Sequence, residues 1–266
     1  FNLSMTIISS GGFLPFNNID LIINSDLKKI VFSILMLFSY FSLFLTYNFF
    51  YIKKKNLNFF AEDIYLFMYL VFLIIVFFVF LNFDYNFSLI LFSIASSISN
   101  IGISLNNTPN NLFFLFLILV IIGGSFFSTS SGIRFLKLYL LIKFSINELL
   151  SHVRPNNVYI NRFNLLNTNM RKQDIYKYFL SVIIFVISLF IISSLLAIFN
   201  FNFQEAFMIG ILTLMNTVNS SMYGLQDFNF SDLNILAKYT LIIFMIIGRV
   251  ELITLLIISK KFLFKN

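Results

Sequence analysis

Three short stretches interrupt long apolar sequence and combine glycine or asparagine with small neighbours, at residues 9–13, 100–104 and 216–220. Inside a membrane, irregular backbone persists only when it is packed in protein or lines a wet cavity. Glycine lets backbone carbonyls turn inward without a Cβ clash, and several such carbonyls together can replace the hydration shell of a cation. The three stretches therefore predict that backbone oxygens coordinate a cation.

We expect twelve residues of these stretches to form the coordination site: Ser10, Gly11, Gly12, Phe13, Asn100, Ile101, Gly102, Ile103, Thr217, Val218, Asn219 and Ser220. Taken singly, each stretch could be an ordinary external loop, but their threefold recurrence favours a shared site. The chain has no cysteine and one histidine, His152. It therefore offers no thiolate metal site, no iron–sulfur cluster and no bis-histidine haem.

A second group of candidates lies where apolar sequence is broken by small residues or by a charge. Residues 123–132 are a Gly/Ser/Thr run inside apolar sequence, which predicts a broken membrane helix, with a plain kink as the alternative. An arginine near mid-membrane costs about 2.5–3.5 kcal/mol on insertion scales, so Arg249 should face protein or water. Glu251, two positions away, points elsewhere on a helix and is a poor ion-pair partner. The candidate gating and pore residues are Gly123, Gly124, Ser128, Thr129, Gly132 and Arg249.

Composition places these residues in a membrane protein. Hydrophobic residues make up 59% of the chain, against about 45–50% in soluble domains, and the mean hydropathy is +0.92. Lys and Arg mark the cytoplasmic side of inner-membrane proteins. That preference explains the net charge of +7 without a nucleic-acid partner.

The positions of the basic residues predict the topology. Basic clusters at residues 53–55, 134–177 and 260–265 should all lie inside. Three apolar segments separate each neighbouring pair of clusters, and three full crossings would put a cluster outside. The middle segments, 87–99 and 203–215, should therefore enter and leave on the same face. The remaining apolar segments give five spans, at residues 30–52, 64–83, 112–133, 178–200 and 233–259. This is the layout of an ion-channel pore.

Several motifs, in order along the chain, resemble those of the Trk-type potassium uptake proteins, the TrkH/TrkG membrane subunit. The most specific are Gly-Gly-Ser at 123–125 with Ser-Thr-Ser-Ser-Gly-Ile-Arg at 128–134, Arg-Pro-Asn-Asn-Val-Tyr at 154–159 and Gly-Arg-Val-Glu at 248–251. The three Gly/Asn stretches are similar to the second, third and fourth filters of that family. Two departures stand out: Leu14-Pro15 replaces small hydroxyl residues, and Asn219 falls where the fourth filter has glycine.

The resemblance implies an all-α polytopic fold of repeated helix–pore loop–helix units. Residues 1–52 would end pore repeat two, 53–146 would be repeat three with a broken second helix, 147–177 a cytoplasmic linker and 178–266 repeat four, with repeat one and the first helix of repeat two missing. It further implies a non-enzymatic, cofactor-free protein of the bacterial inner membrane that conducts potassium. Arg249 would form an internal barrier, and the loop at 123–132 would gate the pore.

Its expected partners are a second copy of the chain, membrane lipid and a TrkA-type nucleotide-binding cytoplasmic ring. Sodium as a second ion, and channel or symport as the mode of transport, stay open. A non-conducting remnant or structural membrane subunit is the main alternative function. A membrane enzyme or electron carrier is disfavoured because paired histidines, cysteines and an intramembrane carboxylate cluster are missing from the sequence.

Overall fold

The structure is a computed structural model that describes residues 2–12, 19–43, 45, 60–80, 85–105, 108, 112–153, 172–225, 230 and 233–249. Within these residues the chain is helical. Its β-structure there is limited to an isolated parallel bridge between Ile122 and Ile133. The predicted all-α class is therefore confirmed.

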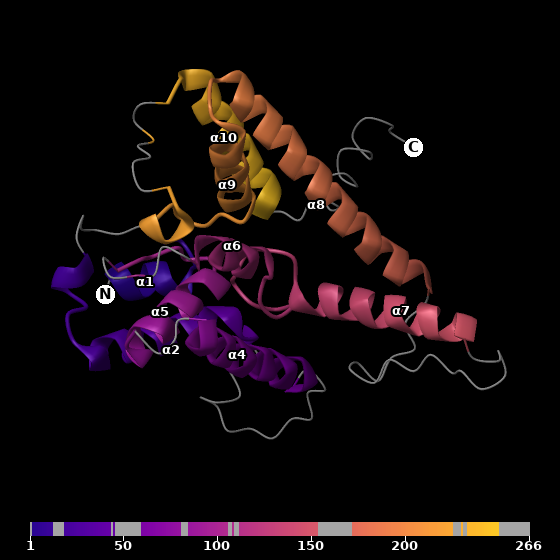
Figure 1. The fold of residues 1–266 in the computed structure, drawn as a ribbon, viewed down its shortest axis with the longest axis horizontal. Helices are drawn as coiled ribbons and strands as arrows, with labels where there is room; N and C mark the ends of the chain where they lie inside the picture. The colour runs from indigo at the N-terminus through magenta and orange to yellow at the C-terminus, as the bar shows by residue number, and fades with distance from the viewer. Residues whose placement is uncertain are drawn as a thin grey trace.

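Two groups of three helices repeat one plan, a long helix, a short helix and a third helix. The first consists of α4 (Phe60–Phe80), α5 (Phe87–Ile98) and α6 (Phe113–Ile121). The second consists of α8 (Lys172–Ile198), α9 (Phe203–Leu214) and α10 (Ile235–Arg249). In Figure 1, α9 and α10 lie beside α8, and the three helices contact one another. The short helices begin and end within one residue of the re-entrant segments expected from hydropathy.

The two short helices match in detail. Each has 12 residues and follows an asparagine N-cap, Asn86 (φ −62°, ψ 137°) or Asn202 (φ −60°, ψ 141°). Each ends in a right-handed helical C-cap, Ser99 (φ −79°) or Met215 (φ −87°). Hydropathy indicated an internal repeat, and the matching cap angles of α5 and α9 support it.

The start of the chain forms part of a third group. Helix α1 (Asn2–Ile8) is followed by a short 3-10 turn, η1 (Ile19–Leu21), and by α2 (Asp26–Tyr40). Helix α1 was not expected from the sequence, because seven residues without a charge carry little periodicity. It precedes the first Gly stretch as α5 and α9 precede the other two, and it contacts α2.

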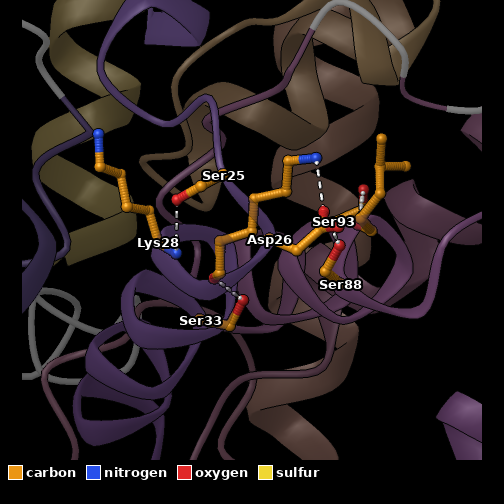
Figure 2. Close-up of polar contacts among 8 residues, drawn as sticks. Ser25, Asp26, Lys28, Ser33, Ser88 and Ser93 are labelled. Carbon is orange, nitrogen blue, oxygen red and sulfur yellow. Dashed lines mark hydrogen bonds and ion pairs between the residues drawn. The ribbon is translucent and has the colours of Figure 1, made fainter.

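The N-terminal end of α2 is fixed to the short helix of the next group (Figure 2). Ser25 caps α2, with its Oγ accepting from the amide of Lys28 at 3.4 Å. Oδ1 of Asp26 accepts from Ser88 Oγ of α5 at 2.7 Å and from Lys29 Nζ at 3.1 Å. Helices α2 and α5 then pack along their length, so the first Gly stretch is held beside the second group.

A continuous helix was expected at 30–52, but the helix is interrupted there because α2 ends at Tyr40. The carboxylate of Asp63, which is 4% exposed, accepts from the amide of Ser42 at 3.1 Å and from its hydroxyl at 2.7 Å. A buried carboxylate on α4 thus satisfies backbone that the break leaves free. Residues 44 and 46–59 of the expected span and turn lie outside the described residues.

Two helices in the described part of the chain are long and apolar enough to cross a membrane, over Glu62–Phe80 and Ile175–Ile198. Both expose large apolar side chains, including Phe67 (58%) and Phe190 (55%). Such faces suit lipid rather than water. Over the described residues α2 and α10 have 15 residues each, so the finer count of five spans stays a prediction.

Helix α7 (Phe135–Val153) follows the broken region and contacts α8. In Figure 1 it extends away from the other helices, and its far end lies beside the start of α8. It extends into the linker expected at 147–177, and α8 starts six residues before the span expected at 178–200. Most of the expected linker between them, residues 154–171, lies outside the described residues.

Candidate ion-conduction site

The three Gly/Asn stretches meet. A Cβ added to Gly12 (φ 66°) would collide with the carbonyl oxygen of Ile101 and would lie 2.6 Å from Cγ2 of Val218. A Cβ added to Gly102 (φ 80°) would collide with the carbonyl oxygen of Val218 and would lie 2.8 Å from its nitrogen. Backbone from three distant parts of the sequence therefore converges, and only glycine allows these two approaches.

Each stretch leaves its short helix in the same way. The first residue after the helix and its cap has left-handed backbone: Ser10 (φ 52°), Asn100 (φ 59°) and Asn216 (φ 52°). The amides of these residues donate to carbonyls three positions back, and the amides that follow donate to carbonyls five positions back. The bonds of the second kind are Gly11 to Thr6, Ile101 to Ser96 and Thr217 to Leu212. The three loops thus share one backbone design.

The asparagines of two loops tie each loop to the third helix of its own group. Nδ2 of Asn100 donates to the carbonyl of Val120 in α6 at 2.8 Å, and Nδ2 of Asn216 donates to the carbonyl of Met245 in α10 at 3.0 Å. Asn100 Nδ2 also lies 3.3 Å from Thr217 Oγ1 in the neighbouring loop. These bonds hold the loops against the helices behind them.

The third loop has no residue that repeats the left-handed glycines. Gly12 and Gly102 stand two residues after Ser10 and Asn100, and Val218 stands two residues after Asn216. Neither Val218 nor Asn219 has positive φ. A Cβ on Gly102 would strike the carbonyl before Asn219, as a Cβ on Gly12 would strike the carbonyl before Gly102. The expectation that Asn219 takes the glycine position therefore stays a prediction.

The other expected coordination residues lie nearby. The carbonyl of Ile103 accepts from Ser96 Oγ of α5 at 2.7 Å, and Ser104 Oγ lies 3.2 Å from Ser221 Oγ at the end of the third loop. The side chains of Asn219 and Ser220 each keep a buried oxygen without a partner among the described residues. Phe13, also expected here, lies outside the described residues.

The Gly/Ser/Thr run forms a closed loop between α6 and α7 rather than a helix kink. Its base is joined by the bridge from Ile122 to Ile133, with Gly123 N donating to Ile133 O at 2.9 Å. Gly132 (φ 92°) stands directly against Gly123, and a Cβ on either would contact the other's backbone. We call residues 123–132 the inner loop.

Two charged residues that the sequence did not single out as site residues hold the inner loop. Nη1 of Arg134 lies 3.0–3.2 Å from four loop oxygens, which belong to Ser125, Ser128 and Ser130. The buried carboxylate of Glu62 accepts from the amide of Phe126 at 2.9 Å. Hydropathy could not indicate these contacts because they depend on tertiary structure. The loop also packs on α2, where a Cβ at Gly124 would collide with the carbonyl of Tyr40.

The inner loop touches the first Gly stretch through Thr129. Its Oγ1 donates to the carbonyl of Ile8 at 3.0 Å and lies 3.3 Å from Ser10 Oγ. Nη1 of Arg249 donates to Ser131 Oγ at 2.9 Å, and its Nη2 lies 3.4 Å from the carbonyl of Ser9. The structure thus brings together Arg249, the inner loop and the converging backbone. Glu251 lies outside the described residues.

A cavity of about 660 Å³ opens beside this junction. One side is formed by residues 9–11 and the other by α9, α10 and residues 216–219, with Arg249 at its edge. Apart from Arg249 its lining is small, polar or apolar and carries no ionisable side chain. No group of three or more His, Asp or Glu side chains that could hold a metal ion occurs in the described residues. Backbone and side-chain oxygens therefore remain the available ligands.

Comparisons with known proteins bear on the fold. No protein-family model matches the sequence, and no curated protein matches it. Among solved structures the chain is similar to the potassium transporter TrkH from Vibrio parahaemolyticus, with a TM-score of 0.77 and 22% sequence identity. The match covers 95% of this chain and 56% of that one. The chain therefore has the all-α fold of a TrkH membrane transporter over about half of that transporter's length.

Proposed function

We propose that this chain contributes the filter and gate of a path that carries potassium across a membrane, with sodium as a second ion still to be tested. The observation that carries the proposal is the convergence of Gly12, Gly102 and Val218 above an inner loop bound to Arg249. A fold shared with a potassium transporter supports the same function.

In this mechanism backbone carbonyls of residues 10–13, 100–103 and 217–220 replace water around the ion. Carbonyl dipoles at fixed positions can offset the cost of removing the hydration shell. Covalent chemistry and a bound cofactor have no part in this mechanism. Potassium is the transported ion rather than a resident cofactor.

The inner loop is the gate of the proposed path. Its contacts with Ile8 and with Arg249 place it against the converging backbone. The guanidinium of Arg249 raises the energy of any cation that passes close to it, because water screens the charge only partly in a narrow path. Opening would require the loop to leave Ser10 and Arg249.

The proposed assembly follows the same resemblance. Units at 1–52, 53–146 and 178–266 surround one path with five spans, and the linker at 147–177 faces the cytoplasm of a bacterial cell. A homodimer and a nucleotide-binding ring of TrkA type are its proposed partners.

One uptake experiment tests the function. The protein is expressed from its natural gene in a bacterial strain that lacks potassium uptake, and rubidium and sodium entry are measured. We expect rubidium entry above that of cells with an empty vector and reduced entry with Gly102→Ser. Rubidium entry equal to the empty vector, with the protein present in the membrane, would contradict the proposal.

A second candidate, a membrane subunit that does not conduct, is favoured by one observation. The third loop, at residues 216–220, contains no glycine, and the isopropyl group of Val218 lies against Gly12. The two functions differ in a binding measurement, because potassium should stabilise a conducting filter against heat and should not stabilise a subunit without a filter.

A further inference from the structure

We infer that the side chain of Val218 is the constriction of this filter and limits the passage of potassium through it. The inference rests on the proposed function, since it assigns a specific role within the same site. It starts from the third loop, in which a branched side chain lies against the left-handed glycine of the first loop.

Backbone conformation separates the third loop from the other two. Gly12 and Gly102 adopt φ of 66° and 80°, whereas neither Val218 nor Asn219 has positive φ. A β-branched residue such as Val218 is a genuine outlier in the left-handed region. The third loop therefore does not repeat the left-handed turn of the two glycines.

The place of the Val218 side chain gives the second step. Its Cγ2 and Cβ lie 2.6 and 3.2 Å from the point where a side chain on Gly12 would begin. Its nitrogen lies 2.8 Å from the corresponding point on Gly102. Val218 is therefore wedged between the two glycines, with methyl groups toward one and backbone toward the other.

Methyl groups cannot coordinate a cation, and a dehydrated ion needs oxygen on its open sides. Passage beside Val218 therefore requires the ion either to keep part of its water, for which there is little room, or to lose coordination. Both add to the barrier for permeation. A smaller or more polar residue at this position should lower that barrier.

The first readout is rubidium uptake in the potassium-uptake-deficient strain. Val218→Gly should raise uptake about tenfold, which corresponds to ~1.4 kcal/mol of barrier. Val218→Thr has nearly the same shape but replaces a methyl by a hydroxyl, so it should raise uptake less. Val218→Ile adds bulk and should lower it. Equal uptake in all four proteins, at equal amounts in the membrane, would overturn the inference.

The second readout is the melting temperature of the full chain purified in detergent, with potassium or with N-methylglucamine at the same ionic strength. We expect the potassium-dependent rise to be larger in Val218→Gly than in the parent chain, because at one concentration a ligand that binds more tightly stabilises the protein more. A potassium-dependent rise of the same size in both proteins would overturn the role of Val218 and leave the filter intact. No rise in either protein would instead contradict the proposed function.

Discussion

Nη1 of Arg249 donates a hydrogen bond of 2.9 Å to Oγ of Ser131, across 118 residues of sequence. The same guanidinium lies 3.4 Å from the carbonyl of Ser9, beside the first Gly stretch. One cation on α10 thus joins the inner loop to the converging backbone. Arg249 was expected to face protein or water and to place a charge near the ion path. Its contact with Ser131 fits the first expectation, and its position beside Ser9 bears on the second.

Replacing Arg249 tests the barrier. Arg249→Ala removes both the positive charge and the bond to Ser131, so cation uptake should rise. Arg249→Lys keeps the charge and should change uptake far less. The measurement is rubidium entry, with membrane amounts of each variant as the control. Lower uptake in Arg249→Ala at an unchanged amount of protein would refute a barrier role.

The contact of Thr129 with the first stretch tests whether the inner loop obstructs the path. Thr129→Ala loses the bond to the Ile8 carbonyl and the contact with Ser10, so the loop should leave more readily and rubidium uptake should increase about two- to fivefold, as for one net hydrogen bond. Thr129→Ser should keep the parent rate. Thr240→Ala is the matched control, because Thr240 Oγ1 bonds only within α10. A similar increase in the control would show a general loosening of the protein.

Arg134 should matter for stability more than for the barrier. Its Nη1 reaches four oxygens of the inner loop, and hydrogen bonds to charged groups contribute about 1.5–3 kcal/mol each. Arg134→Gln should therefore lower the melting temperature and expose the loop to protease. Lys143→Gln removes a positive charge from α7, the helix that follows Arg134, without touching the loop and should have little effect. Equal melting temperatures for the two variants would mean that Arg134 does not hold the loop.

Topology can be read with single cysteines, since the chain has none of its own. Asn24, before α2, and Glu148, in α7, are both exposed. An impermeant maleimide applied to intact cells should label Asn24→Cys and should leave Glu148→Cys unlabelled until the cells are broken. Labelling of Glu148→Cys from outside would contradict the re-entrant arrangement of α5 and α9.

Hydropathy and charge predicted much of the helical order. The segments expected at 87–99 and 203–215 are α5 and α9, and the run at 123–132 is an irregular loop between helices. Such features follow from local composition and from the positive-inside rule. They depend on no contact between distant residues.

The sequence did not predict features that depend on contacts between residues far apart in the chain. Helix α2 ends where Asp63 of another helix binds Ser42, and the inner loop is held by Glu62, whose partner is 64 residues away. The contact of the Val218 side chain with Gly12 was not predicted either, because it joins residues that are far apart in sequence. Sequence patterns do not encode such bonds directly.

The central claim is that converging loop backbone binds potassium, and one pair of glycines tests it. Gly102 and Gly224 both have left-handed backbone, with φ of 80° and 81°, so a serine is strained at either. A Cβ at Gly102 would also strike the Val218 carbonyl, whereas at Gly224 it would lie 3.4 Å from the Phe113 ring, an ordinary contact.

The measurement is the rise in melting temperature of the detergent-purified chain when potassium replaces N-methylglucamine. Both Gly102→Ser and Gly224→Ser should melt earlier than the parent chain because of backbone strain. We expect potassium to stabilise the parent and Gly224→Ser, and to have no effect on Gly102→Ser. The same potassium-dependent rise in all three proteins would contradict the claim that these loops form the filter.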